Sequence, residues 1–197
     1  MFIRLTTAFL FATLAACSTK APPAPVPAAA PTPAEPVPAP AATPTPAPEP
    51  AAPLAVGDPA PDVTLTLHDG KLVVLSALRG SRALIYFYPK DDTPGCTVEA
   101  QGLRDRAADL TAAGVQVFGV SVQDADSHRA FIEKHNLPFP LVVDAGAELA
   151  TAFHVPLIGN GMTARQSFLI GKDGRIEALW LQVDPSTHAA DVLAAVQ

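Results

Sequence analysis

A segment rich in proline and alanine, residues 21–53, sets the strongest limit on how this chain can fold. It consists almost wholly of Pro, Ala, Thr, Val and Glu, and it shows no apolar periodicity that could build a core. Because proline fixes φ and removes a backbone donor, the segment favours polyproline II, with a semi-rigid reach of about 100 Å at ~3.1 Å per residue. The composition changes at Leu54, so we expect residues 54–197 to form one well-buried domain, and 17–53 to be either a spacer or an insert without a length requirement.

The first residues predict a cleaved leader. Arg4 precedes an apolar run, residues 5–16, which is too short to span a bilayer as a mature helix. Its last three residues and the cysteine that follows, Leu-Ala-Ala-Cys17, resemble the lipobox of bacterial lipoproteins. That resemblance implies a signal peptide over residues 1–16, a lipid anchor on Cys17 and a periplasm-facing place in the cell envelope. Ser18 resembles the sorting signal for the outer membrane, and an ordinary secretory signal cleaved nearby is the alternative.

Charge balance and cysteine count argue against two classes of function. The chain carries a formal net charge of −6 without a cluster of Lys and Arg, whereas nonspecific nucleic-acid binding depends on neutralising phosphates. Its two cysteines cannot make a disulfide framework, and its five histidines show no zinc-type spacing with them. We therefore expect no nucleic-acid partner, no metal site and no cofactor.

The domain alternates predicted strands and helices. Strands at 63–67 and 71–75 flank an Asp-Gly turn, and 83–87 is a continuous apolar run typical of a central strand buried on both faces. Further strands are expected at 115–121, 141–143, 166–170 and 175–180, and helices at 96–113, 127–135, 148–153 and 188–196. This order predicts an α/β fold with a mixed sheet between helices and an N-terminal β-hairpin, and it resembles thioredoxin-like proteins.

Cys96 stands where a loop turns into a helix, directly after the predicted central strand. Its sulfur would there face the free amides and the positive end of the helix, which favour the nucleophilic thiolate. A lone cysteine is also commonly an inert core residue. Its position alone leaves both interpretations open.

The residues around Cys96 favour the first interpretation. The segment 88–97, Tyr-Pro-Lys-Asp-Asp-Thr-Pro-Gly-Cys-Thr, fits the pattern P-x-x-x-T-x-x-C and closely resembles peroxiredoxins of the bacterioferritin-comigratory, or Q, type. The likeness covers essentially all of residues 54–197. It continues through residues 58–61, 65–70, 114–121, 131–140 and 165–174.

The resemblance implies a function for four residues. Cys96 would be the peroxidatic cysteine, and Thr93 would hydrogen-bond the sulfur and the peroxide. Pro89 would shield the pocket, and Arg165 would hold the thiolate and the peroxide oxygens. A hydroxyl, backbone amides and a guanidinium would then converge on charge that moves from sulfur to the leaving oxygen. Taken singly, the last three residues also suit a helix cap, a strand end and a surface cation.

The sequence departs from many Q-type members at one position, because Gln101 stands where they carry a resolving cysteine. A lipidated Cys17 could not replace it. The chain therefore resembles one-cysteine members, which implies that hydrogen peroxide or an organic hydroperoxide oxidises Cys96 to sulfenic acid. An external thiol, thioredoxin-like, glutaredoxin-like or small, would then regenerate the cysteine through a mixed disulfide.

Three rival functions share parts of this pattern. A tethered thiol–disulfide oxidoreductase needs C-x-x-C, but Thr93 occupies the first of those positions. A copper-delivery protein needs paired thiols with a histidine, and the cysteine count does not supply them. An envelope-tethered binding domain without chemistry remains the third alternative, and the presence of all four motif residues speaks against it.

Overall fold

The computed structural model describes residues 53–197. The signal peptide 1–16, the acylated Cys17 and all but the last residue of the segment 17–53 lie outside this range and stay predictions. Within the part that the structure describes, no helix is long and apolar enough to cross a membrane.

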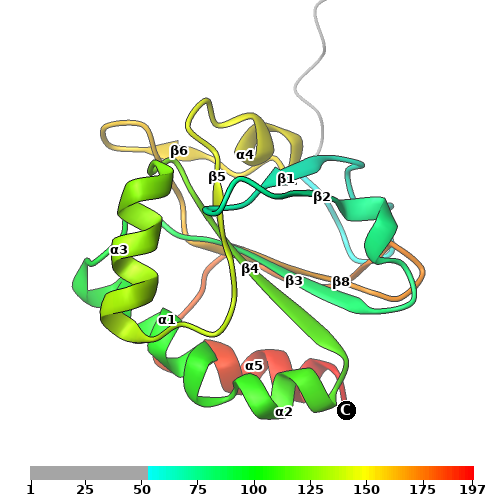
Figure 1. Ribbon diagram of the computed structural model, residues 1–197. Coiled ribbons are helices and arrows are strands. Elements are labelled where there is room, and N and C mark those ends of the chain that lie inside the picture. Colours follow the sequence, from blue (N-terminus) through cyan, green and yellow to red (C-terminus); the bar gives the residue numbers. More distant parts are fainter. Residues whose placement is uncertain (1–52) are drawn as a thin grey trace, which may run out of the picture. The chain divides into compact units, whose positions relative to one another are not determined.

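A five-stranded mixed sheet in the order β5-β4-β3-β8-β9 forms the middle of the domain (Figure 1). The first three of these strands run parallel, and β8 and β9 are antiparallel to their neighbours. Their bounds are β3 (Arg82–Phe87), β4 (Val115–Ser121), β5 (Leu141–Val143), β8 (Gln166–Ile170) and β9 (Ile176–Trp180). This arrangement confirms the predicted α/β, thioredoxin-like fold.

The central strand β3 separates two hydrophobic cores. Side chains of a strand alternate between the faces of a sheet, so Ile85 and Phe87 enter one core, and Leu84 and Tyr86 enter the other. The second core contains Cys96. The sequence 83–87 is apolar throughout because both faces of this strand are covered.

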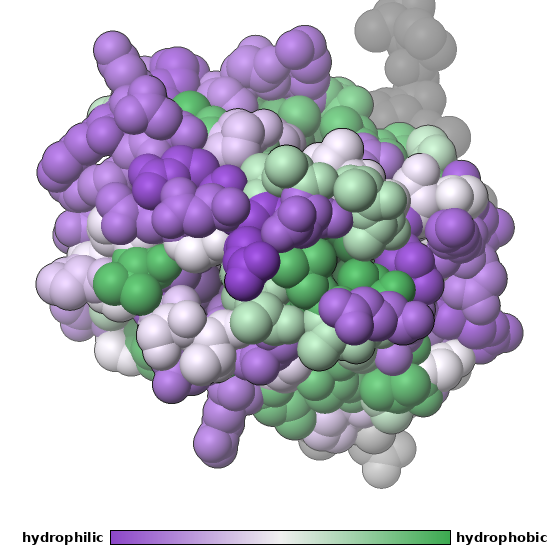
Figure 2. Space-filling model, turned by 90° about the horizontal axis from the view of Figure 1, so that it is seen from below, coloured by the Kyte–Doolittle hydropathy of each residue, from purple (hydrophilic) through white to green (hydrophobic). Residues whose placement is uncertain are grey.

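Helices cover both faces of the sheet. In Figure 1, α1 (Pro94–Asp105), α2 (Ala107–Ala112) and α5 (His188–Ala195) lie below it, and α4 (Glu148–Ala152) lies above it. The remaining α-helix, α3 (Ala125–His135), packs beside β5. Viewed from the side of α2 and α5, apolar side chains gather near the middle of this face among hydrophilic ones (Figure 2).

The predicted N-terminal hairpin is confirmed. Strand β1 (Thr64–Thr66) pairs antiparallel with β2 (Leu72–Val74), and Gly70 in the connection has a φ of 83°, which glycine adopts without steric cost. A short 3-10 helix, η1 (Leu75–Leu78), follows. A second two-stranded sheet, β6 (Leu157–Ile158) with β7 (Met162–Thr163), precedes β8 and was not predicted.

The predicted helix 96–113 is wrong in two respects. It begins earlier, at Pro94, because proline suits the first helical position, where no acceptor is available for an N–H. It is also interrupted at Arg106, whose φ of −107° and ψ of 10° leave the helical range. Leu103 and Leu110 nevertheless lie buried in the same core, so the predicted apolar face is present on two helices.

Candidate active site

Cys96 lies in the first turn of α1, just beyond the end of β3. Thr93 is the N-cap residue by its backbone, and Pro94 follows it as the first helical residue. The amides of Gly95 and Cys96 therefore belong to the first turn, where helical geometry supplies no acceptor. The cysteine is 1% exposed, so its side chain lies in a nearly water-free environment at the amino-terminal end of the helix.

Sheet topology brings Arg165 to this sulfur. Strand β8 pairs with β3 so that Gln166 lies opposite Phe87, which puts the preceding residue beside the start of α1. Nη2 of Arg165 donates to Cys96 Sγ over 3.2 Å. Burial lowers the pKa of Arg165, but the charges of Glu99 and Cys96 outweigh it and raise the pKa overall, so the guanidinium stays protonated.

Glu99 and His188 complete a chain of ionisable groups that sequence reasoning missed. Nη1 of Arg165 donates to Glu99 Oε2, and Glu99 Oε1 lies 2.9 Å from His188 Nδ1, although these two atoms are not aligned as a hydrogen bond. Both residues are 0% exposed. The position of Glu99, three residues after Cys96 on one helix, was a usable signal, whereas nothing in the sequence links His188 to this site.

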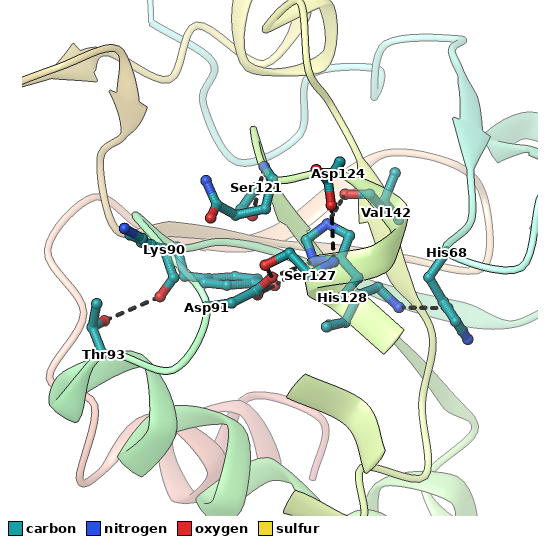
Figure 3. A network of polar contacts seen from close by, with 12 residues as sticks. His68, Lys90, Asp91, Thr93, Ser121, Asp124, Ser127, His128 and Val142 are labelled. Carbon is teal, nitrogen blue, oxygen red and sulfur yellow. Dashed lines mark hydrogen bonds and ion pairs between the residues drawn. The ribbon is translucent and has the colours of Figure 1, made fainter. Parts of the chain in front are cut away.

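The expected hydrogen bond from Thr93 to the sulfur is absent. Its hydroxyl instead donates to the carbonyl of Lys90 over 3.0 Å and caps no helix amide (Figure 3). A hydroxyl has one proton to donate, so Thr93 cannot serve the sulfur at the same time. Pro89 is half-buried between β3 and α1, beside the carbonyl of Tyr88, which accepts a hydrogen bond from Thr163 Oγ1 over 2.8 Å.

A buried polar network holds the loop before α1 (Figure 3). Asp91 accepts hydrogen bonds from Tyr88 Oη over 2.7 Å and from Ser127 Oγ over 2.6 Å. His128 places Nδ1 2.9 Å from the same carboxylate and Nε2 3.1 Å from the carbonyl oxygen of Val142. Acceptor oxygens therefore face both ring nitrogens of His128.

The charge on Asp91 follows from this network. Burial raises its pKa, but the hydrogen bond and charge of His128, with the hydroxyls of Ser127 and Tyr88, outweigh burial and lower the pKa overall. The side chain is therefore an ion-paired carboxylate that ties the loop to α3. An ion pair that is buried and fully hydrogen-bonded is costly to break from one side.

A second tie lies nearer the surface. Asp92, which has a positive φ of 56°, contacts Lys134 Nζ at 2.5 Å and His135 Nε2 at 2.9 Å. The hydrogen bond from Lys134 is the main cause of the lowered pKa of Asp92. Gln101, at the position of the expected resolving cysteine, places Nε2 3.3 Å from His135 Nδ1. The residue that departs from the family pattern thus joins α1 to α3.

Other features of the domain lie away from Cys96. An apolar groove of about 1040 Å³ runs beside α2 and β4, and none of the site residues lines it. Within residues 53–197, no group of three or more His, Cys, Asp or Glu side chains is placed to hold a metal ion. The chemistry that this arrangement supports is that of a buried sulfur nucleophile, with a guanidinium and first-turn amides stabilising negative charge on sulfur or on an attached oxygen.

Comparison with known proteins points to the same chemistry. The model of the AhpC/TSA family matches residues 56–179. A putative peroxiredoxin Bcp from Coxiella burnetii is 39% identical over 136 residues, which cover 66% of this chain and 90% of that protein. Peroxiredoxin Bcp from Bacillus subtilis is 39% identical over 134 residues, covering 65% of this chain and 85% of its own length.

Solved structures agree with these relatives. Peroxiredoxin Q from Xanthomonas campestris superposes with a TM-score of 0.66 at 35% identity, covering 73% of this chain and 94% of that one. A cysteine-to-serine mutant of peroxiredoxin Q from Xylella fastidiosa gives a TM-score of 0.68 at 32% identity, covering 73% of this chain and 96% of that one.

Proposed function

This chain belongs to the AhpC/TSA family as a peroxiredoxin of the Q, or Bcp, type, a thiol-dependent peroxidase, and we propose that Cys96 carries its chemistry. The observation that supports this assignment best is the 3.2 Å contact between Arg165 Nη2 and the buried Cys96 sulfur. Hydrogen peroxide and organic hydroperoxides are the proposed substrates. The bacterioferritin comigratory protein of Xanthomonas campestris, whose solved structure resembles this chain, has alkyl peroxide reduction activity.

In the proposed reaction, the thiolate of Cys96 attacks one peroxide oxygen. A sulfur–oxygen bond forms, the oxygen–oxygen bond breaks, and the leaving oxygen takes up a proton as water or an alcohol. Arg165 and the first-turn amides stabilise the charge that moves from sulfur to oxygen. Gly95 leaves room for this arrangement, because a Cβ there would lie 3.3 Å from Arg165 Nη2. Thr93 would join by turning its hydroxyl from Lys90 to the bound peroxide.

An external thiol completes the proposed cycle. It attacks the sulfenic acid of Cys96, releases water and forms a mixed disulfide, and a second thiol then frees the cysteine as a thiol. Gln101 offers no sulfur for an internal disulfide. Since Cys96 is 1% exposed, the first turn of α1 must open before a protein thiol reaches it.

We also propose that the enzyme works as a lipoprotein of the cell envelope, with its domain facing the periplasm. The support is the sequence alone, namely Leu-Ala-Ala-Cys17 after a short apolar run and the proline-rich segment that follows. Mass spectrometry of the protein extracted from membranes tests it. We expect a diacylglyceryl group on an N-terminal Cys17, and an unmodified start at any other residue would remove the anchor from the proposal.

Peroxide consumption by the purified full chain tests the assignment of Cys96. With dithiothreitol as reductant, the wild type should turn over, Cys96→Ser should not, and Cys17→Ser should match the wild type. Sustained turnover by Cys96→Ser would refute the mechanism. The rival dithiol oxidoreductase gains no support, since Thr93 replaces the first cysteine of the required motif.

A further inference from the structure

Buried polar atoms without hydrogen-bond partners cluster near Cys96. Within residues 53–197 they belong to Tyr86, Ser167, Glu99 and His188, and for His188 both ring nitrogens are affected. Tyr86 and Ser167 are opposite each other on β3 and β8. The rings of Tyr86 and His188 lie 6.3 Å apart, and His188 Nδ1 is 2.9 Å from Glu99 Oε1. Unpartnered buried polar groups are rare, so this cluster requires an explanation.

The cluster is continuous with the reactive sulfur. Cys96 Sγ contacts Arg165, Arg165 contacts Glu99, and the far oxygen of Glu99 faces His188. Glu99 and His188 are fully buried, and the Arg165 side chain is 18% exposed. The charges of these four groups therefore interact with little screening by water.

Charge balance assigns a state to His188. Arg165 and Glu99 cancel each other, so a thiolate at Cys96 leaves one net negative charge among the side chains, which the partial charges of the first-turn amides offset only in part. Burying an unpaired charge is strongly unfavourable. A proton on His188 removes this imbalance and pairs the imidazolium with the free oxygen of Glu99. The reactive state of the site is neutral only when His188 is protonated.

We propose that His188 is a positioning residue that holds a proton while Cys96 is a thiolate, and that it thereby sets the pH range in which the cysteine reacts. The proposal rests on the function proposed above. His188 acts through Glu99 and Arg165 rather than by touching the sulfur. It keeps Glu99 engaged on both oxygens and leaves the second nitrogen of Arg165 available to Cys96.

The other groups around His188 do not supply this charge. Tyr86 on β3 stays neutral, because burial and the charge of Glu99 raise its pKa well above the ordinary value. Trp180 on β9 stacks edge-on and does not titrate. Asp184 and Asp191 are exposed and bond Ser186 and Thr187 instead.

The proton count balances through the oxidation step. The sulfur gives an electron pair to one peroxide oxygen, and the leaving oxygen takes up one proton. The negative charge on sulfur disappears as the sulfenic acid forms, and the one proton that His188 then gives up balances the one that the leaving oxygen takes up. The sum is thiol plus hydroperoxide giving sulfenic acid plus water or alcohol.

The first test follows alkylation of Cys96 by iodoacetamide against pH in the full chain, read by mass spectrometry on the peptide that contains Cys96. His188→Gln fills similar space and cannot carry the charge. We expect it to move the alkylation midpoint upward by about one pH unit or more. An unchanged midpoint in a folded His188→Gln protein would overturn the proposal.

The double variant Glu99→Gln/His188→Gln separates charge from packing. It removes one negative and one positive charge together, so the thiolate is again balanced by Arg165. We expect its midpoint to return most of the way to that of the wild type. A packing role for His188 predicts instead that the second replacement adds to the damage of the first, and that outcome would also overturn the proposal.

Fluorescence reports the protonation of His188 directly. The chain has one tryptophan, and the centroid of the Trp180 ring lies 5.9 Å from that of His188. A protonated imidazole quenches indole emission, so emission should rise as His188 loses its proton. We expect this step at a higher pH than the alkylation midpoint, at a lower pH in Cys96→Ser, and not at all in His188→Gln.

If the rise in Trp180 emission of the wild type were complete at a pH below the alkylation midpoint, His188 would be neutral beside the thiolate. That result would overturn the proposal. Neither measurement uses peroxide. Failure of the wild type to consume peroxide would therefore count against the proposed function. The alkylation and fluorescence results would still test the role of His188.

Discussion

Arg165 divides its guanidinium between two partners, and this division explains why the residue must be arginine. Nη1 meets Glu99 and Nη2 meets the Cys96 sulfur, so the planar fork fixes the angle between the two contacts. A lysine ammonium is a point charge without that fork. It would satisfy the buried carboxylate first and leave the sulfur without a donor.

Arg165→Lys should therefore lower kcat/KM for hydrogen peroxide by about 100-fold while the protein stays folded. Stopped-flow measurement of peroxide reduction gives the rate, and thermal unfolding gives the stability. Arg175→Lys is the matched control, because Arg175 is exposed and donates to the Gly57 carbonyl on another side of the domain. Near wild-type rates for Arg165→Lys would place this residue outside the catalytic machinery.

At the residue scale, the sequence predicted the residues proposed to touch the reacting atoms better than the buried residues that surround them. Cys96 and Arg165 meet because motif spacing and sheet order both place them at the end of β3. Glu99 and His188 were missed, since an acidic residue in a helix and a histidine near the chain end are normally solvent-exposed. The Thr93 hydroxyl donates its only proton to the carbonyl of Lys90, so its contact with the peroxide stays a prediction.

At the element scale, the loop between β3 and α1 depends on α3 for its shape. Asp91 in the loop and His128 in α3 form the buried pair of this contact, and Asp92 adds an exposed one with His135. The loop positions Thr93 and the first turn of α1. Loss of the buried pair should thus affect both stability and the site.

Asp91→Asn should destabilise the domain by about 3 kcal/mol at neutral pH, because it removes the carboxylate that balances His128. The folded pKa of Asp91 is lowered from 3.8, so its contribution is present above that value and is lost as pH falls through the lowered pKa. The stability difference between wild type and variant in urea unfolding should shrink below about pH 4. Asp126→Asn, at an exposed carboxylate, should stay within ~0.5 kcal/mol of wild type at neutral pH. A pH-independent difference for Asp91→Asn would contradict the ion pair.

Gly119 shows how β4 makes room for the site. It is the register partner of Tyr86, and a Cβ there would lie 2.6 Å from the Tyr86 ring and from Leu141. Gly119→Ala must displace the Tyr86 ring and the Leu141 side chain, and we expect the free energy of unfolding to fall by about 1–3 kcal/mol.

The matched control for this substitution is Gly102→Ala in α1, where a Cβ meets only the carbonyl oxygen of Pro185 at 4.0 Å. Alanine favours a helix over glycine, so Gly102→Ala should stabilise by about 0.5–1 kcal/mol. Urea unfolding of both variants decides the comparison. Equal stability of wild type and Gly119→Ala would mean that Tyr86 has an alternative position.

Element existence was predictable here, and element boundaries were less so. Strand β4 matched its predicted range because an apolar run of that length between turn residues admits few alternatives. Helix α3 begins at Ala125 rather than Ser127, because Asp124 caps it by accepting from the Ser127 amide over 2.8 Å. The sheet β6–β7 was missed because two-residue strands carry no periodicity.

At the scale of the whole molecule, the number of thiol groups limits the proposed catalytic cycle. Residues 53–197 contain one cysteine, and Gln101 occupies the place where a resolving thiol would stand. Cys17 is predicted to carry lipid and lies outside the part that the structure describes. An oxidised Cys96 therefore has no partner within its own domain.

A domain cut at Leu54 should turn over peroxide only with an added thiol reductant. Without reductant, peroxide should convert Cys96 to sulfenic acid and, in excess, to irreversible sulfinic acid, because no neighbouring thiol captures the first product. Mass spectrometry would show one and then two added oxygen atoms on the peptide that contains Cys96. A disulfide between the Cys96 residues of two molecules is the competing product. Its yield should rise with protein concentration, because it needs two chains, whereas oxygen addition should not.

Gln101→Cys tests the geometric part of the argument, because it places a thiol on α1 five residues after Cys96. If this variant still passed to sulfinic acid as fast as the wild type, then the position would not lie within reach of the oxidised cysteine, and the absence of a thiol there would not explain the dependence on an external one.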